Sequence, residues 1–274
     1  EQLDLGLNEI KTIESDAFKF NPKLDYIELR RNRIESLDPN IFSNLAVIRI
    51  FYLDDNQLND LPADLFKHNV NLEQISLHSN KIPILYPNLL KNQAKLEAIW
   101  LSGNKIKAVP GDLFQNNVEL QEIHLNYNEI QNLDDPNTFS TLTKLELLDL
   151  NKNKIGPNLP ETLFQNNVEL KKLFLSHNKI RTLHENVFAS LTKLEQLFLD
   201  SNEIASIPDN LFINNVKLEQ LTLSNNQIIN LSIDVFTPLT MLYEIWLQEN
   251  DYSDQNKQDL KTYFSNTNTE ALIW

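Results

Sequence analysis

Three side chains of the kinds that together perform nucleophilic catalysis occur in the middle of the chain. Ser102, His124 and Asp149 are separated by 22 and 25 residues. A serine hydroxyl activated by an imidazole, which a carboxylate orients, is the arrangement of acyl-transfer enzymes. The sequence lacks the strained turn that presents such a serine, and with 4 glycines it offers no glycine-rich oxyanion loop. We interpret the three as surface residues and predict that the chain is not an enzyme.

The sequence also lacks the motifs that bind metals or cofactors. No cysteine occurs, so thiolate metal sites, disulfides and cysteine nucleophiles are excluded within this chain. No phosphate-binding glycine-rich loop is present. The histidines are scattered over different segments rather than spaced as metal ligands: His68, His78, His124, His177 and His184. The sequence therefore predicts neither a metal site nor a cofactor.

The charge balance restricts the class of partner. The formal net charge is -14 and the sequence pI is about 4.8. Nucleic-acid binding depends on clustered lysine and arginine, so we expect no nucleic-acid partner. One local exception is a basic patch near the N-terminus, beside Asp54 and Asp55: Arg30, Arg31, Arg33 and Arg49. It is either a solvated surface or a patch that steers an acidic loop of a partner.

These residues must be positioned by a repeated element, because the sequence is strongly periodic. A block of the form Leu-x-Leu-x-x-Asn-x-Ile recurs every 24 residues, with two steps of 25, and its asparagines are Asn8, Asn32, Asn56, Asn80, Asn104, Asn128, Asn153, Asn178, Asn202, Asn226 and Asn250. A second column follows most of them by ten or eleven residues: Phe18, Phe42, Phe66, Leu90, Phe114, Phe139, Phe164, Phe188, Phe212 and Phe236. Two columns in register indicate a solenoid.

Each period predicts one short strand. In Leu173-Phe174-Leu175 the alternation points both leucines inward and Phe174 outward. An asparagine after the strand can both donate to and accept from buried backbone groups, which an aspartate cannot. The phenylalanine column is expected to fill the opposite side of the core. Both columns are interpreted as structural, as are the prolines that end inward-facing segments: Pro62, Pro110, Pro160 and Pro208.

With these motifs the sequence resembles the leucine-rich repeat family over residues 1 to about 252, in the 24-residue variety typical of animal extracellular proteins. The block Leu-Phe-Gln-Asn-Asn-Val-Glu-Leu at 113–120 recurs unchanged at 163–170. The resemblance implies an α/β solenoid, a horseshoe with a parallel sheet on its concave face and loops or short helical turns on its convex face. We expect about eleven repeats, the first one truncated. In the family, the concave face usually binds the partner.

The residues predicted to point outward from that sheet are unusually aromatic. Tyr52, Trp100, His124, Phe174, Phe198 and Trp246 occupy one central column, and Tyr127 flanks it. Aromatic side chains dominate binding hot spots, so these seven are the candidate partner-binding residues. The alternatives are that the rings only pack on one another and stabilise the sheet, or that another segment of the same protein covers them.

The last 22 residues, 253–274, depart from the repeat. Leu260 and Phe264 have helical spacing, and Leu272-Ile273-Trp274 is apolar, so we expect a segment that caps the solenoid. No apolar run is long enough to span a membrane, and Glu1 is not followed by a secretion signal. Asn230-Leu231-Ser232 is a glycosylation sequon, which matters only in a secreted chain.

The hypothesis favoured by these features is a non-enzymatic, extracellular recognition module that binds another protein. The resemblance suggests innate immunity, and the asparagine-rich duplicated repeats suggest an insect leucine-rich immune protein. Two alternatives remain: the ectodomain of a cell-surface receptor or adhesion protein, and the targeting half of an enzyme whose catalytic domain is absent. A homodimer formed through the same face is a further expectation.

Overall fold

The computed structural model describes residues 1–272, in which the chain forms two compact units. The first unit comprises Glu1–Ile130 and Asn137–Leu145, and the second comprises Gln131–Pro136 and the chain from Glu146 onward. The repeat spacing continues across this division, so the sequence gives no signal of it.

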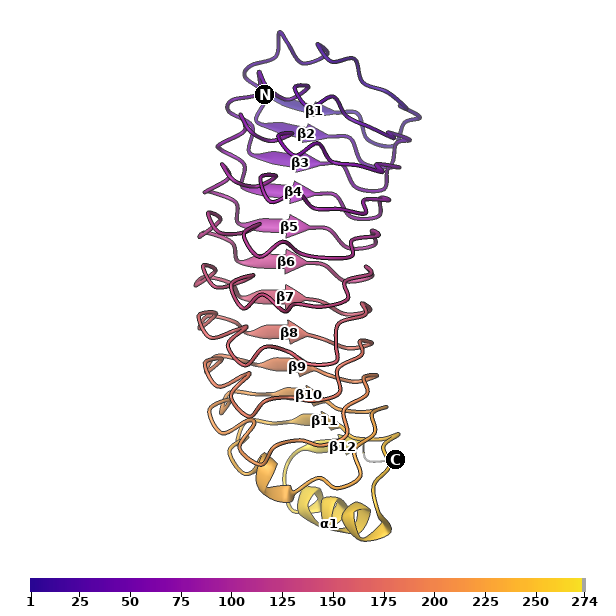
Figure 1. Cartoon of the computed structure of the whole chain (residues 1–274), viewed down its shortest axis with the longest axis vertical. Helices are drawn as coiled ribbons and strands as arrows, with labels where there is room; N and C mark the ends of the chain where they lie inside the picture. The colour runs from indigo at the N-terminus through magenta and orange to yellow at the C-terminus, as the bar shows by residue number, and fades with distance from the viewer. Residues whose placement is uncertain (273–274) are drawn as a thin grey trace. The chain divides into compact units, whose positions relative to one another are not determined.

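Each unit is built on short parallel strands that follow one another in chain order (Figure 1). In the first unit they are β1 (Gln2–Asp4), β2 (Tyr26–Glu28), β3 (Ile50–Tyr52), β4 (Gln74–Ser76), β5 (Ala98–Trp100) and β6 (Glu122–His124). In the second they are β7 (Leu147–Asp149), β8 (Lys172–Phe174), β9 (Gln196–Phe198), β10 (Gln220–Thr222), β11 (Glu244–Trp246) and β12 (Glu270–Leu272).

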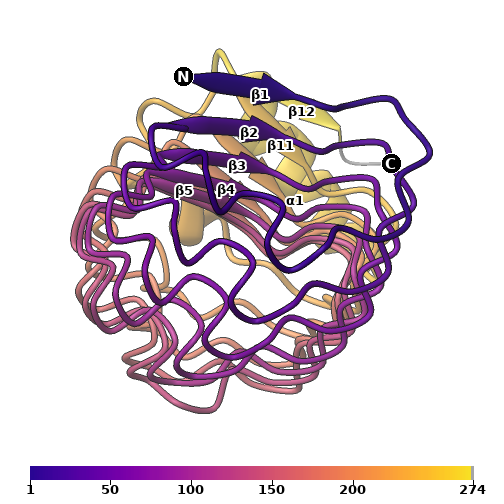
Figure 2. The same cartoon turned by 90° about the horizontal axis from the view of Figure 1, so that it is seen from above.

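The predicted solenoid of parallel strands is confirmed. Neighbouring strands pair residue for residue at one-repeat spacing, as in Leu173↔Leu197 and Phe174↔Phe198. Leu173 and Leu175 are fully buried, whereas Phe174 points outward and is half-buried. In the first unit, β1–β5 lie along one side of the coil and loops close each turn on the other side (Figure 2). Turns and loops, rather than helices, make most of these connections.

The asparagine column forms a ladder of side-chain to backbone hydrogen bonds. Asn178 donates from Nδ2 to the carbonyl oxygens of Leu150, one turn earlier, and of Leu175, each at 3.0 Å. Its Oδ1 accepts from the backbone N–H of Ile155 at 3.0 Å. The buried carbonyls and amides of the turn are therefore satisfied by one side chain, as the sequence predicted.

The phenylalanine column is fully buried opposite the strands and forms a spine of stacked rings. Phe42 and Phe66 have ring centroids 6.3 Å apart with planes 2° from parallel, and Phe188 and Phe212 are 6.5 Å apart at 13°. The spacing follows from the repeat, because each ring occupies the same position in successive turns. These contacts close the wide side of each turn, as expected.

A second column of buried amides beside this spine was not predicted. Asn69, Gln93, Asn117 and Asn215 are at most 1% exposed. Asn117 donates from Nδ2 to the carbonyls of Leu90 at 3.0 Å and Gln93 at 2.8 Å, and Asn215 makes the equivalent bonds to Phe188 and Leu191. The repeated Asn-Asn-Val block contained this signal, since polar residues do not recur at one position of a buried turn without a partner.

One residue in each turn, directly before the ladder asparagine, adopts a left-handed backbone conformation. Ten such residues are not glycine and have φ between 52° and 58°, among them Asp55, Tyr127 and Glu249. Gly103 occupies the same position with φ +66°. The conformation lets the chain leave the strand and turn into the core, at a steric cost that glycine avoids.

The single-residue expansion at Gly156-Pro157-Asn158 is accommodated in the loop, with Asn158 bridging Thr182 of the next turn. A Cβ placed on Gly156 would lie 2.1 Å from the carbonyl oxygen of Lys179. No side chain fits at that distance, so glycine is required here by close approach of the two backbones.

The segment after Asn250 contains a helix and a strand. The N-cap residue of helix α1 (Asp254–Ser265) is Ser253, whose side chain accepts a hydrogen bond from the Asn256 N–H at 3.1 Å. Leu260 and Phe264 are buried, and the Phe264 ring lies 5.2 Å from Phe236 in the short 3-10 helix η1 (Ile233–Phe236). The helical spacing is confirmed, whereas strand β12, which pairs with β11, was not predicted.

The domain boundary at residue 252/253 and the capping role of 253–274 stay predictions, and Ile273 and Trp274 lie outside the described residues. Within residues 1–272, the helices are too short and too polar to cross a membrane.

Candidate functional site

The candidate site is the outward face of the strands. It comprises the first and third residues of each strand, such as Lys172 and Phe174 of β8, and the two residues after the buried leucine that follows the strand, here Ser176 and His177. Its aromatic members are partly exposed in both units. In the second unit, Phe174 and Phe198 are lateral neighbours, as predicted, with ring centroids 4.8 Å apart and planes at 33°. Trp246 is 38% exposed and donates from Nε1 to Glu244 Oε1 at 2.9 Å. Thr222 separates it from Phe198.

In the first unit, the aromatic residues pair differently. Trp100 and His124 occupy adjacent strands and stack at 6.0 Å, with planes 18° apart. Tyr52 packs edge to face against Tyr26 at 5.7 Å. Tyr127, in the left-handed position, is 54% exposed. The structure thus brings Trp100 and His124 into contact, whereas Tyr127 lies after strand β6 and outside the central column.

The arrangement expected of a serine nucleophile does not form at Ser102. Its hydroxyl donates to the Oδ1 of Asn126, the residue at the same position one repeat later. His124 stacks on Trp100, and its Nε2 lies 3.6 Å from Glu122. The hydroxyl and the imidazole therefore have separate partners.

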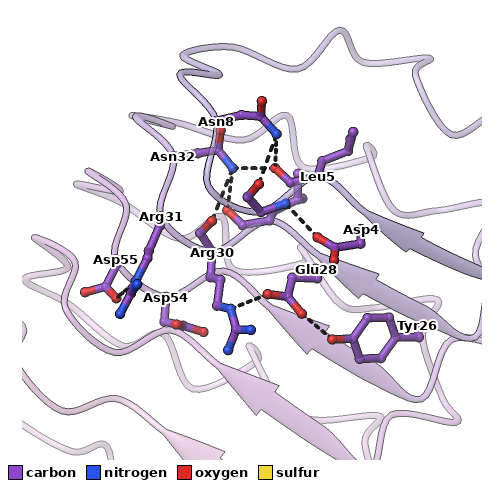
Figure 3. Close-up of polar contacts among 12 residues, drawn as sticks. Asp4, Leu5, Asn8, Tyr26, Glu28, Arg30, Arg31, Asn32, Asp54 and Asp55 are labelled. Carbon is purple, nitrogen blue, oxygen red and sulfur yellow. Dashed lines mark hydrogen bonds and ion pairs between the residues drawn. The ribbon is translucent and has the colours of Figure 1, made fainter.

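Each arginine of the predicted basic patch has an acidic partner, and Figure 3 shows those of Arg30 and Arg31. Arg30 pairs with Glu28 and Arg31 with Asp55, whose Oδ2 is 3.5 Å from the Arg31 Nε. Arg33 pairs with Glu9 at 2.9 Å, and Arg49 makes two hydrogen bonds to Glu73. The patch is locally close to neutral, although steering of an acidic loop stays a prediction.

A hollow of about 290 Å³ opens on the outward face of the first unit. It is lined by Arg30, Tyr52, Asp54, Ser76, His78 and Trp100. Two of these, Tyr52 and Trp100, were singled out from the sequence as binding residues. Its lining combines two aromatic rings with a carboxylate, an imidazole and a guanidinium, so apolar and charged groups converge on one surface.

Asp54 and His78 interact at the base of this hollow. The Asp54 side chain is 9% exposed, and its Oδ2 lies 3.3 Å from the His78 Nε2. Burial alone would raise the pKa of Asp54, but hydrogen bonds from His78 and Ser76 outweigh burial and hold this pKa below its usual value. The hydrogen bond to Asp54 raises the pKa of His78.

Sequence reasoning missed this pair because it judged the histidines by their separation along the chain. His78 follows Asp54 by 24 residues, so the repeat places both at one position of adjacent turns. The same rule accounts for the partners of Arg31, Arg33 and Arg49, each 24 residues away, but not for Arg30, which pairs with Glu28 in its own turn. Comparison of each charged residue with those one repeat away would have found both.

The sequon at Asn230 lies on the surface. Asn230 is exposed, while Leu231 is buried and Ser232 caps η1 by accepting from the Asp234 N–H at 3.2 Å. An oligosaccharide on Asn230 would extend into solvent, so the position is compatible with the predicted glycosylation.

The chain belongs to the Leucine rich repeat family, whose model matches residues 1–58, 47–106, 94–155, 158–204 and 194–251. None of the curated proteins compared with it gives a significant match. Leucine-rich repeat solenoids are protein-interaction modules, which present an extended surface built from successive turns.

Three solved structures illustrate the breadth of this fold. A leucine-rich repeat protein of Leptospira interrogans is similar with a TM-score of 0.75 and 23% identity, over 99% of this chain and 71% of that one. The leucine-rich repeat domain of APL1B gives 0.72 and 22%, over 89% and 75%. A chain of the Toll–Spatzle complex of Drosophila gives 0.68 and 23%, over 95% of this chain and 42% of that one. Similarity at this level concerns the fold.

Proposed function

We propose that the chain is a non-enzymatic recognition module that binds another protein through its outward face. The observation that carries this proposal is the Phe174–Phe198 pair, two apolar rings in van der Waals reach on neighbouring strands, both partly exposed to solvent. Partly exposed aromatic rings on a rigid sheet lose little conformational entropy on binding, which is why such residues dominate interface energetics.

The residues proposed to contact the partner are those predicted from the sequence. Phe174, Phe198 and Trp246 belong to the second unit. Tyr52, Trp100, His124 and Tyr127 belong to the first. The competing interpretation is that the rings only stabilise the sheet through cross-strand packing, which contributes on the order of 0.2–1 kcal/mol per pair. The two interpretations differ in what loss of the rings does to binding at unchanged stability.

A protein partner is also supported by charge. A chain with a net charge of -14 repels a phosphate backbone at long range, and the four arginines of the N-terminal patch are already paired with carboxylates. Self-association through the same rings is a further arrangement, in which the partner is a second copy of the chain.

We further propose that the protein acts outside the cell, in innate immunity. The support is the fold shared with the repeat domain of APL1B and with Toll, whose complex is described as a hub in development and innate immunity, and the exposed sequon at Asn230. A secreted protein would be recovered from body fluid with a glycan on Asn230. Recovery in the membrane fraction would favour a receptor ectodomain instead.

The test is capture from native body fluid by the intact chain and by a variant carrying Trp100→Ala, Phe174→Ala, Phe198→Ala and Trp246→Ala. The matched control removes four exposed apolar side chains away from the strands: Val70→Ala, Val118→Ala, Val168→Ala and Val216→Ala, which are 42–47% exposed in the native chain. Circular dichroism and melting temperature establish that both variants are folded.

The proposal requires that one protein, identified by mass spectrometry and rebound in purified form, is captured by the intact chain and by the valine control but lost with the aromatic variant. Equal capture by all three proteins would place the binding surface elsewhere. Light scattering of the purified chain at increasing concentration reports the homodimer separately.

A further inference from the structure

We propose that Asp54, Asp55 and His78 form a binding site for a divalent transition-metal ion of the zinc class. Each residue offers one ligand atom, and the three atoms lie within 4.8 Å of one another. Two of the proposed partner-binding rings, Tyr52 and Trp100, line the same hollow as Asp54 and His78. The three ligands are not among those rings, so binding of an ion and binding of a protein are tested by different variants.

The spacing of the first two ligands already suits a metal. Zinc bonds of about 2.0–2.1 Å at a tetrahedral angle separate two ligand atoms by about 3.3 Å. The His78 Nε2 and the Asp54 Oδ2 are 3.3 Å apart, a separation longer than a strong charge-assisted hydrogen bond. A metal ion would therefore enter between them without a change in backbone position.

Both ligands are held in place by groups around them. Asp54 lies two residues after strand β3 and is 7% exposed, so neighbouring groups restrict its carboxylate. The His78 Nδ1 lies 3.1 Å from the Ser79 Oγ, which leaves Nε2 directed toward the carboxylates. A hydrogen bond from the second ring nitrogen is the usual way in which proteins orient a metal-ligating histidine.

The third ligand completes the donor set. Asp55 follows Asp54 in the left-handed conformation with φ 52°. One imidazole nitrogen with two carboxylate oxygens suits zinc, cobalt or nickel, whereas calcium and magnesium prefer sites made only of oxygen ligands. Because the hollow lined by Tyr52 and Trp100 lies over Asp54 and His78, a fourth position is open to water or to a carboxylate or imidazole of a ligand.

A nearby cation opposes the metal. The Arg31 Nε is 3.5 Å from the Asp55 Oδ2, and the Arg31 side chain is 64% exposed (Figure 3). Arg31 must swing into solvent for Asp55 to bind an ion, which its exposure permits. Removal of this arginine should therefore strengthen metal binding, an effect in the opposite direction from structural damage.

The experiment titrates the whole chain with Co²⁺, whose visible absorption reports coordination geometry, and with Zn²⁺ by calorimetry. The absence of cysteine removes thiolate binding from the signal. We expect one ion per chain, no saturable binding after His78→Gln or Asp54→Asn, and about tenfold weaker binding after Ser79→Ala. Arg31→Met should tighten binding. Melting temperatures measured without metal establish folding.

The matched control is His184→Gln. His184 Nε2 lies 3.5 Å from Glu161, so it is an exposed imidazole beside a carboxylate, as at His78, but outside the three-residue cluster. Binding that is unaffected by His78→Gln, or reduced as much by His184→Gln, would overturn the proposal. So would an absence of 1:1 binding to the unaltered chain, or displacement of Co²⁺ by an equal concentration of Ca²⁺.

Discussion

The Nδ2 of Asn104 lies 3.0 Å from the carbonyl oxygen of Leu77, which is 27 residues earlier in the chain and one turn away. The same nitrogen donates to Leu101 O at 2.9 Å, and Oδ1 accepts from the Ile82 N–H at 3.0 Å. One buried side chain thus serves three backbone groups of two adjacent turns. The adjacent turns are joined here by hydrogen bonds that do not belong to the sheet.

Replacement of Asn104 by Ala should lower the free energy of unfolding by on the order of 1–3 kcal/mol, because it leaves buried backbone groups without partners. Asn117→Ala should cost less. Asn117 donates to two carbonyls, but its own Oδ1 is buried without a partner, so the substitution also removes an unsatisfied atom. Urea unfolding of the two variants measures the difference, and equal losses would contradict this account.

Gly156→Ala should destabilise the chain more than Gly103→Ala. A Cβ at Gly156 meets the Lys179 carbonyl oxygen at 2.1 Å, which only a backbone shift can relieve. At Gly103 the nearest atom is 3.4 Å away, so the cost is that of a left-handed alanine, about 1–2 kcal/mol. Melting temperatures of both variants test the order. A larger loss at Gly103 would show that conformation outweighs contact.

Glu249→Gly should stabilise the protein, although glycine usually destabilises. Glu249 is exposed and has φ 58°, so glycine relieves a steric cost of about 1 kcal/mol and removes no buried contact. The gain is reduced by the greater freedom of glycine in the unfolded chain. Thermal unfolding measures the change. Glu185→Gly, at an exposed position without positive φ, is the control and should not stabilise.

The Arg49–Glu73 pair should make stability depend on pH at the acid end. The paired guanidinium lowers the pKa of Glu73 below its usual value of 4.5. A lowered folded-state pKa stabilises the native state above the unfolded pKa, and this contribution is lost as pH falls through the folded pKa. Arg49→Met should therefore lower the melting temperature near neutral pH but have progressively less effect below about pH 4.5. An effect independent of pH would mean that packing of the arginine stem, rather than charge, is responsible.

The sequence predicts the features that recur in every turn, but not those that depend on particular pairs of side chains in adjacent turns. Leu173, Asn178 and Phe188 were placed correctly because every turn needs the same buried side chains and hydrogen bonds, so these residue types recur at a fixed spacing in the sequence. The pairing of Phe174 with Phe198 followed from the same period. A role of these rings in partner binding does not follow from the sequence, because a half-buried ring is compatible both with binding and with packing that only stabilises the sheet.

What the sequence reading missed depends on side chains one repeat apart. Lys171 binds Glu146 and Lys193 binds Glu169, at separations of 25 and 24 residues, in the same manner as Asp54 and His78. Lys144 and Glu119 repeat the Lys193–Glu169 pair in the duplicated blocks, but such pairs do not recur in every turn, so they leave no column along the chain. Asn117 was missed for another reason: the repeated Asn-Asn-Val block was used only as evidence of duplication, and the recurrence of an amide at one position of the turn was not interpreted as burial.

The register of the strands also determines which changes in chain length the fold accepts. From Asn32 to Asn128 and from Asn178 to Asn250, each ladder asparagine binds the equivalent carbonyl oxygen of the preceding turn, so the turns inside a unit have equivalent neighbours. Deletion or insertion of one whole repeat therefore restores contacts between equivalent turns, whereas a change of a few residues moves the asparagine away from the carbonyl oxygens that it binds. Natural variants of such a chain are expected to differ by entire repeats, and each added repeat would lengthen the outward face by one strand.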